Sequence, residues 1–152
     1  MRLAGMTFTL RPATAADVEW LYAVRRETMQ EYVEQMFGYW DDEAQRARLA
    51  EPGDLANMQV IVADRRPAGL LHVERDRSGI FLANIQVLPA LQGRGLGTAV
   101  IRMLMSEARA SGRPLRLQVL KVNTAARRLY ARLGFTVTDE TESHIRMVWR
   151  PA

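Results

Sequence analysis

Residues 85–104 of the sequence are IQVLPALQGRGLGTAVIRML. An apolar run typical of a strand meets Pro89, then the glycine-rich stretch GRGLG (93–97), and then an amphipathic run typical of a helix. The N-terminus of a helix carries unpaired amides and a partial positive charge, and glycine lets the backbone come close to an anion. The stretch therefore predicts an anion-binding loop, most simply for a pyrophosphate. A tight turn that binds no ligand is the alternative.

Two familiar phosphate-binding loops do not fit this stretch. A P-loop ends in Gly-Lys followed by Ser or Thr, which the sequence lacks here. The dinucleotide-binding fingerprint needs a third glycine where this chain, after Gly93 and Gly95, has Thr98. The anion-binding loop therefore belongs to neither of these classes.

Residue patterns along the chain predict seven strands and four helices. The strands are expected at 7–12, 58–64, 67–75, 80–88, 115–120, 135–140 and 144–149. Apolar spacings of three and four, with capping residues, predict helices at 18–37, 41–49, from the glycine stretch to about 111, and at 123–133. Pro52 and Gly53 predict a turn.

The order of these elements predicts the fold class. The strands at 58–64, 67–75 and 80–88 are separated by short turns and should form an antiparallel meander. A helix crosses over between Leu88 and Leu115, which implies a parallel pair of strands there. No repeat or linker interrupts the chain. We predict a mixed α/β (α+β) fold in a single domain, 1–152, with a mostly antiparallel sheet of about seven strands and about four flanking helices.

The composition argues against several classes of protein. Without cysteine, and with only His72 and His144 as histidines, the sequence offers no disulfide, no thiol nucleophile and no metal-ligand spacing, so no metal is expected. No run approaches the roughly 20 apolar residues that cross a bilayer, so we expect a soluble, cytoplasmic protein without a membrane partner. The net charge of +4 comes from 20 Arg and one Lys scattered along the chain, which favours a solvated surface over a nucleic-acid site.

Two segments carry a resemblance to a known family. VLPALQGRGLGT (87–98) resembles the acetyl-CoA-binding motif of the GNAT family of N-acetyltransferases, Gln/Arg-x-x-Gly-x-Gly/Ala, with Gln92, Gly95 and Gly97 at the defining positions. LKVNTAARRLYARLGF (120–135) resembles the strand, asparagine, helix and Tyr-x-x-x-Gly-Phe of the same family. The order of elements from Thr7 to Trp149 matches as well. The resemblance covers nearly the whole chain and implies a GNAT domain whose sheet is splayed at the cofactor site.

The resemblance also implies which residues bind acetyl-CoA, the expected cosubstrate. Val87 and Leu88 would lie along the pantetheine arm, and a strand amide near Leu88 would stabilise the oxyanion of the tetrahedral intermediate. Asn123 would hydrogen-bond the cofactor and also cap the following helix, with a plain helix N-cap as the alternative. Arg94 would add a charge-assisted contact, or would simply face solvent. The pyrophosphate would be bound by the loop residues Gln92, Gly93, Arg94, Gly95, Gly97 and Thr98.

Tyr130 is the expected catalytic residue, at the position where the family places its tyrosine. Attack of an amine on a thioester releases a thiolate, and a phenol with a pKa near ~10 holds its proton at neutral pH and can donate it. A core tyrosine is the alternative. Some family members use a strand glutamate as the base, but this chain has Asn84 and Gln86 there. Ordered water and the side chains of His72, Glu74, Glu142 and His144 stay open as routes for the proton of the amine.

The acceptor site is expected between the first helices and the sheet. The segment EYVEQMFGYWDDE (31–43) combines aromatic residues with carboxylates, which would suit a cationic amine. A core-facing aromatic stripe beside a solvated acidic edge is the alternative. The residues concerned are Glu31, Tyr32, Glu34, Phe37, Tyr39, Trp40, Asp41 and Asp42.

These features predict an acetyl-CoA-dependent N-acetyltransferase. It would transfer the acetyl group directly to a primary amine, on a small molecule, a peptide or a protein, in a ternary complex. A catalytically weak acyl-CoA-binding sensor is the alternative, because the strand carboxylate is absent. A nucleic-acid-binding protein rests on charge alone and is not expected. Family members are often dimers, so a homodimer stays open.

Overall fold

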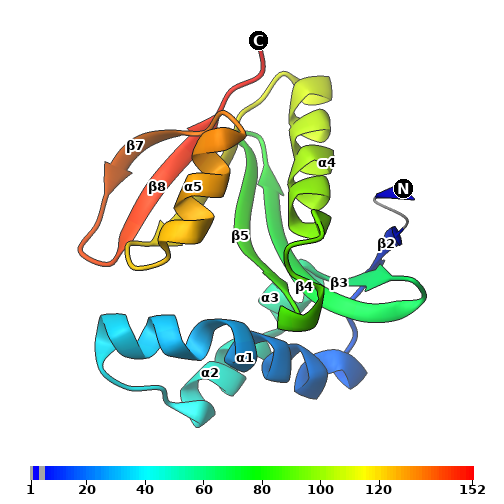
Figure 1. The fold of residues 1–152 in the computed structure, drawn as a ribbon, viewed down its shortest axis with the longest axis vertical. Coiled ribbons are helices and arrows are strands. Elements are labelled where there is room, and N and C mark those ends of the chain that lie inside the picture. Colours follow the sequence, from blue (N-terminus) through cyan, green and yellow to red (C-terminus); the bar gives the residue numbers. More distant parts are fainter. Residues whose placement is uncertain (1, 4–5) are drawn as a thin grey trace. The chain divides into compact units, whose positions relative to one another are not determined.

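The computed structural model describes residues 2–3 and 6–152, and its elements follow the predicted order (Figure 1). The strands are β1 (Arg2–Leu3), β2 (Met6–Pro12), β3 (Met58–Ala63), β4 (Arg66–Asp76), β5 (Gly79–Val87), β6 (Leu115–Leu120), β7 (Thr136–Glu140) and β8 (His144–Trp149). The helices are α1 (Val18–Phe37), α2 (Asp42–Leu49), α3 (Pro52–Ala56), α4 (Leu96–Ser111) and α5 (Thr124–Arg132), with single 3-10 turns η1 (Ala15–Asp17) and η2 (Pro89–Leu91). Among the described residues, none of the helices combines the length and the apolar character needed to cross a membrane.

The strands form one mixed sheet in the order β1-β2-β3-β4-β5-β6-β8-β7, and the chain folds into two compact units. The first unit comprises the described residues up to 72 together with 84–99, and the second comprises 73–83 and 100–152. Strands β4 and β5 and helix α4 therefore each contribute residues to both units. The predicted fold class is confirmed, with a two-residue strand and a short helix added to the expected elements.

In the first unit, strands β1 to β4 pair antiparallel in chain order, and the β3–β4 pair is the one predicted for the first two strands of the meander. Phe8 of β2 lies opposite Ala63 of β3, and Val60 of β3 lies opposite Leu70 of β4. The β3–β4 turn places Asp64 and Arg65 at φ of +50° and +67°, the left-handed conformation that a two-residue type I′ hairpin needs. The short turn thus sets the register of this hairpin, and the register shifts by one residue at an irregularity between Ile61 and Val62 of β3.

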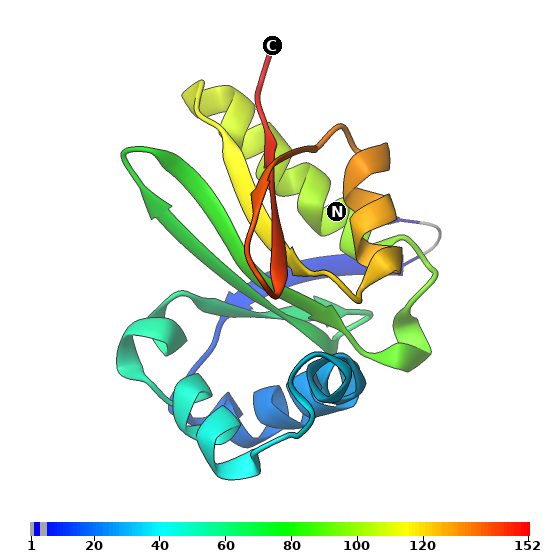
Figure 2. The same ribbon diagram turned by 90° about the vertical axis from the view of Figure 1, so that its left-hand side faces the viewer.

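Helices α1 and α2 pack against these strands (Figure 2). The shared core consists of buried side chains from the two helices and from β3 and β4: Leu21, Tyr22, Val24, Leu49, Met58, Val60 and Leu70. Before α1, the amide of Thr14 donates to Asp17 Oδ2 at 2.8 Å, as in a capping box. Gly38 ends α1 as predicted, at φ +86°, with its amide bonded to the carbonyl of Glu34.

Residues 52–56 form helix α3, where the sequence predicted only a turn. Pro52 stands in its first turn, where a helix needs no amide donor and the fixed φ of proline is favourable. The amide of Leu55 bonds to the carbonyl of Glu51 at 2.9 Å, which closes the turn in helical geometry. The prediction was wrong because Pro-Gly is equally compatible with a β-turn and with the start of a short helix.

The second unit confirms the parallel pair predicted from the helical crossover. Ile80, Phe81 and Leu82 of β5 pair parallel with Leu115, Arg116 and Leu117 of β6. Strand β6 then pairs antiparallel with β8, and β8 with the edge strand β7. The Trp149 ring of β8 meets the guanidinium of Arg109 in α4 at 5.3 Å and lies 3.4 Å from the Cβ position of Gly134 after α5. Helix α4 and the turn after α5 therefore both lie against this tryptophan.

Candidate active site

The predicted anion-binding loop lies between η2 and α4, and its glycines adopt the conformation that only glycine takes without strain. Gly93 has φ +77° and Gly95 has φ +79°. The first helical hydrogen bond joins the amide of Ala99 to the carbonyl of Gly95 at 3.0 Å. The amides of the first turn of α4, up to Thr98, therefore have no helical carbonyl to bond. Such a row of free amides at a positive helix end is suited to an anion.

Gln92 ties this loop to the end of strand β5. Its side-chain Nε2 donates to the carbonyl oxygen of Val87 at 2.8 Å. This hydrogen bond closes a short loop around η2. Within this described part of the chain, the side chain of Gln92 does not bond to the amides of the glycine stretch, so it does not compete with a ligand for them. The sequence pointed to Gln92 through the family motif but did not predict this bond.

The end of β5 is held on its other edge by β4. The amide of Leu88 donates to the carbonyl of Ala68 at 2.9 Å. This amide is therefore already used, and Leu88 itself does not supply the oxyanion donor that the resemblance implied near this position. Since successive residues of a strand point their amides to opposite edges, the amide of Val87 is the nearer candidate.

Gly69 is a residue that the sequence analysis missed. A Cβ at this position would lie 2.2 Å from the carbonyl oxygen of Gln86 and 3.1 Å from Cα of Val87. Strand β4 therefore approaches β5 so closely that no side chain fits, next to the residues expected along the pantetheine arm. A glycine inside an apolar strand run was the available signal for such an approach.

A pair of glycines allows the loop to be tested with a matched control. Gly93 and Gly112 have φ of +77° and +67°, and a Cβ at either would meet nothing within 4 Å. Both Gly→Ala changes should cost about 1 kcal/mol of stability, measured by urea unfolding. Gly93→Ala alone should raise the Kd for acetyl-CoA about 10-fold or more in calorimetric titration, because contacts to a charged ligand are lost. Equal affinity of the two variants would contradict the assignment of the loop.

Asn123 is the N-cap of α5 in the second unit. Its Oδ1 accepts from the amide of Ala126 at 3.2 Å, which confirms the capping role predicted as the alternative. The cap uses the side-chain oxygen only, so the side-chain Nδ2 is left to donate to another group. Capping and cofactor binding are therefore compatible in one residue.

Tyr130 lies on the buried face of α5. Its side chain is 8% exposed, and its ring packs against Phe135 with centroids 5.7 Å apart. Burial raises the pKa of Tyr130 to about 12. No described residue hydrogen-bonds its hydroxyl. The phenol therefore keeps its proton throughout the physiological pH range. A general acid must stay protonated until the step in which it donates its proton.

Two of the side chains considered as bases, His72 and Glu74, lie beside Asp54, with one polar atom of each of the three within 4.8 Å of the others. Ser143 Oγ lies 2.7 Å from Nδ1 of His144, and burial, followed by the charge of Arg146, lowers the pKa of this histidine. His144 is therefore neutral at pH 7, bonded within its own turn. His72 is buried in β4, with Nε2 at 4.0 Å from Asp54. Glu74 and Glu142 are exposed.

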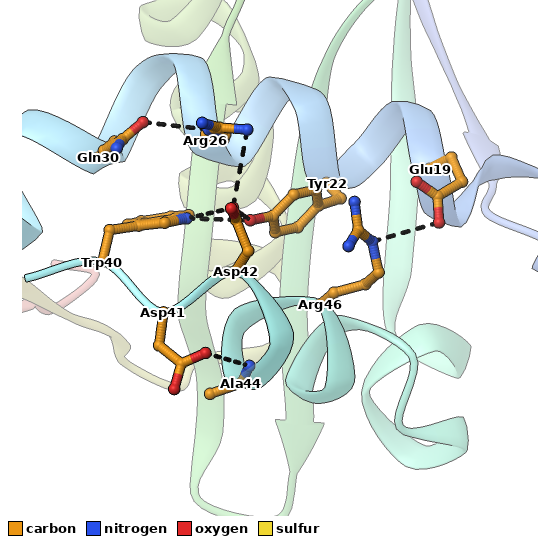
Figure 3. Close-up of polar contacts among 9 residues, drawn as sticks. All are labelled: Glu19, Tyr22, Arg26, Gln30, Trp40, Asp41, Asp42, Ala44 and Arg46. Atoms are coloured by element: carbon orange, nitrogen blue, oxygen red, sulfur yellow. Dashed lines mark hydrogen bonds and ion pairs between the residues drawn. The ribbon is translucent and has the colours of Figure 1, made fainter.

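The segment after α1 is fixed by a polar cluster around Asp42 (Figure 3). Tyr22 donates its hydroxyl to Asp42 Oδ1, and Trp40 Nε1 donates to the same oxygen at 3.0 Å. These hydrogen bonds, that of Tyr22 first, lower the pKa of Asp42. Arg46 lies 4.4 Å from the centre of the Tyr22 ring and pairs with Glu19 at 3.3 Å. The cluster holds the start of α2 against α1.

The sequence offered two interpretations of residues 31–43: an acceptor site, or a core-facing aromatic stripe beside a solvated acidic edge. The structure agrees with parts of each. Phe37 and Tyr39 are 51% and 67% exposed, so they are not part of a core-facing stripe. Asp41 caps α2 by accepting from the amide of Ala44 at 3.1 Å. The outer face of α1 lines an open cavity of about 1040 Å³. The carboxylates that line it are all exposed, as expected of a solvated acidic edge. They are Glu19, Glu27, Glu31 and Glu34.

A second polar cluster, which the sequence analysis did not foresee, lies where α1 meets β5. Arg25 donates from Nε to Gln45 Oε1 at 3.1 Å and from Nη1 to Asn84 Oδ1 at 3.4 Å. Gln86 donates from Nε2 to the same Asn84 oxygen at 3.3 Å. Asn84 thus accepts hydrogen bonds from a guanidinium of α1 and from its own neighbour on β5, Gln86.

Comparison with known proteins identifies the family. Residues 22–135 match the sequence model of the acetyltransferase (GNAT) family, so the chain belongs to this family of N-acetyltransferases. A 66-residue stretch is 41% identical to YobR of Bacillus subtilis (strain 168), named as an uncharacterized N-acetyltransferase. That stretch covers 43% of this chain and only 27% of YobR.

Solved structures confirm the fold. The PaiA N-acetyltransferase of Thermoplasma acidophilum, solved in complex with coenzyme A, matches with a TM-score of 0.74 at 17% identity, over 95% of this chain and 99% of that one. The ribosomal-protein-S18-alanine N-acetyltransferase of Escherichia coli matches with a TM-score of 0.69 at 22% identity, over 96% and 95% of the two chains. The resemblance noted in the glycine and tyrosine segments is therefore confirmed.

Proposed function

We propose that this protein transfers the acetyl group of acetyl-CoA directly to a primary amine in a ternary complex. The observation that carries the proposal is the loop of Gly93 and Gly95, both at positive φ, which leads into the free amides at the start of α4. A pyrophosphate is the ligand that this arrangement suits best. Membership of the GNAT family supports acetyl-CoA as its source.

The remaining cofactor contacts follow from the local geometry. Gln92 holds the loop through Val87, while Gly97 and Thr98 contribute amides of the first helical turn. Arg94 is exposed beside them and would add charge to the phosphate site. Val87 and Leu88 would lie along the pantetheine arm, and Asn123 would donate to the cofactor through the nitrogen that its cap leaves unused.

In the proposed reaction, the neutral amine nitrogen attacks the thioester carbonyl carbon. A C–N bond forms, the C–S bond breaks, and Tyr130 gives its proton to the departing sulfur. The proton lost by the amine passes to water and returns to the tyrosinate through solvent. The products are an N-acetyl amine and coenzyme A, and the enzyme needs no covalent intermediate.

The sensor alternative rests on one observation, the amides Asn84 and Gln86 where a carboxylate base could stand. We also propose that residues 1–152 act as one domain and that the protein is cytoplasmic. The deciding experiment measures acetyl-CoA binding by calorimetry and then release of coenzyme A with a panel of amino acids, aliphatic amines, aminoglycosides and peptides. Binding with saturable turnover supports the enzyme, whereas binding without turnover of any amine supports the sensor.

A further inference from the structure

Arg25 is a cation without a counter-charge in the cluster it occupies. It lies on α1 beside the buried Leu21 and Val24, and its hydrogen-bond partners are the neutral amides of Gln45 and Asn84. No carboxylate among the described residues bonds to it. Burial lowers the pKa of Arg25, and the charge of Arg48 lowers it further. Since a desolvated charge is costly unless it is paired, a guanidinium in this setting calls for an anion that the protein does not itself supply.

Gln86 adds a second, independent feature to the same cluster. Its side chain is only 5% exposed, and its nitrogen is bonded to Asn84. Its Oε1 is buried without a hydrogen-bond partner among the described residues. A buried carbonyl oxygen without a donor is uncommon in folded proteins and marks a place for a water or a ligand N–H.

The two features lie close together because one oxygen joins them. Asn84 Oδ1 accepts from Arg25 Nη1 at 3.4 Å and from Gln86 Nε2 at 3.3 Å. A ligand bound at this cluster meets a cation and a buried hydrogen-bond acceptor whose side chains share one neighbour, Asn84. Arg25 and Asn84 are partly exposed, so the cluster can be reached from solvent.

We propose that this cluster binds the acceptor as a free amino acid, with its carboxylate on Arg25 and its amine N–H on Oε1 of Gln86. The inference rests on the proposed acetyltransferase function and names the acceptor class for it. A simple alkylamine would leave Arg25 unpaired, and the N-terminal residue of a peptide carries no carboxylate next to its amine. Free amino acids are therefore preferred to both.

The test uses acceptors matched in everything except the carboxylate. The common L-amino acids are compared with their α-carboxamides, each with acetyl-CoA and wild-type protein. At least one free acid should exceed its amide by about 100-fold in kcat/KM, the effect expected of a desolvated charge pair. In Arg25→Gln this preference of the free acid over its carboxamide should disappear. Arg26→Gln, an exposed neighbour on the same helix, should keep the preference.

A binding measurement keeps the inference testable without turnover. The preferred amino acid should raise the melting temperature of the wild type, and its carboxamide should not. Without ligand, Arg25→Gln should melt at the same temperature or higher, because an unpaired cation has been removed. A lower melting temperature, with equal loss of activity toward acid and amide, would show a merely structural role and overturn the inference.

The failures of the two proposals are distinguishable. If acids and amides are acetylated equally well by the wild type, the acceptor inference is wrong while the acetyltransferase function stands. If no amine is acetylated, the proposed function fails, and the thermal shift by amino acids still decides whether the cluster binds them. A shift that is equal for acid and amide overturns the cluster as a carboxylate site.

Discussion

Gly69→Ala is expected to destabilise the protein by about 2–4 kcal/mol, the range of severe overpacking. The new Cβ would stand 2.2 Å from the backbone carbonyl oxygen of Gln86, and the backbone itself fixes where a Cβ lies. No rotamer change can relieve the contact, so β4 and the end of β5 must move apart. Urea unfolding followed by circular dichroism measures the loss of free energy.

Gly53→Ala is the control for this change. A Cβ at Gly53 meets nothing within 4 Å, and alanine is favoured over glycine in a helix by about 0.5–1 kcal/mol. This variant should be as stable as the wild type or slightly more stable. If Gly69→Ala matches it, the close approach of the two strands does not exist in solution.

Any Gly69→Ala protein that still folds should also bind acetyl-CoA less tightly than the wild type. The displaced segment contains Val87, whose carbonyl anchors the Gln92 side chain. Movement of that carbonyl loosens the glycine loop without changing any residue in it. A calorimetric titration at a temperature where the variant is folded separates this effect from unfolding.

Tyr130→Phe is expected to lower kcat at least about 100-fold, the effect of losing a general acid. Affinity for acetyl-CoA should stay within about threefold, because the ring and its packing on Phe135 are kept. Stability should change little, because no described residue hydrogen-bonds the hydroxyl. Stopped assays of released coenzyme A and urea unfolding give the two numbers.

Tyr39→Phe is the matched control, since Tyr39 is 67% exposed and lies outside the proposed machinery. It should leave kcat unchanged. Should Tyr130→Phe also retain full kcat, the acid is water or another group, and Tyr130 is a core residue. A large fall in stability would equally contradict the account of its hydroxyl.

The raised pKa of Tyr130 sets the sign of its pH effects. The unfolded phenol titrates near ~10 and the folded one at about 12, so the buried neutral form contributes stability below pH 10. That contribution is lost as pH rises from ~10 to about 12. The rate should rise with pH as the amine deprotonates, and the tyrosine should impose no decline below pH 10. Proton transfer from so weak an acid also requires the departing thiolate to be strongly basic, as a desolvated thiolate is.

The glycine loop could be predicted from the sequence because its signals are local. Gly93 and Gly95 precede an amphipathic run and follow an apolar one, and backbone conformation at such a junction depends on adjacent residues. The crossover from β5 to β6 could be predicted for the same reason, since one amphipathic helix separates two apolar runs. The family motifs then assigned Gln92 and Tyr130 their expected roles.

The cluster around Arg25 could not be predicted, because it depends on residues far apart in the chain. The hydrogen bond from Arg25 to Asn84 spans 59 positions, and no periodicity records which helix face meets which strand residue. The sequence showed Asn84 and Gln86 only as missing bases. Burial of Tyr130 and the contact that excludes a side chain at Gly69 likewise exist only once the strands and helices have packed.

The division of the chain has a consequence for biosynthesis. The first unit includes residues 84–99. Residues 73–83 are synthesised before them but belong to the second unit. Helices α1 and α2 are therefore released well before the strand that gives Arg25 its partner Asn84, and the guanidinium stays hydrated until that strand arrives. Neither unit is a continuous stretch of chain, so no single cleavage or gene truncation releases one of them whole.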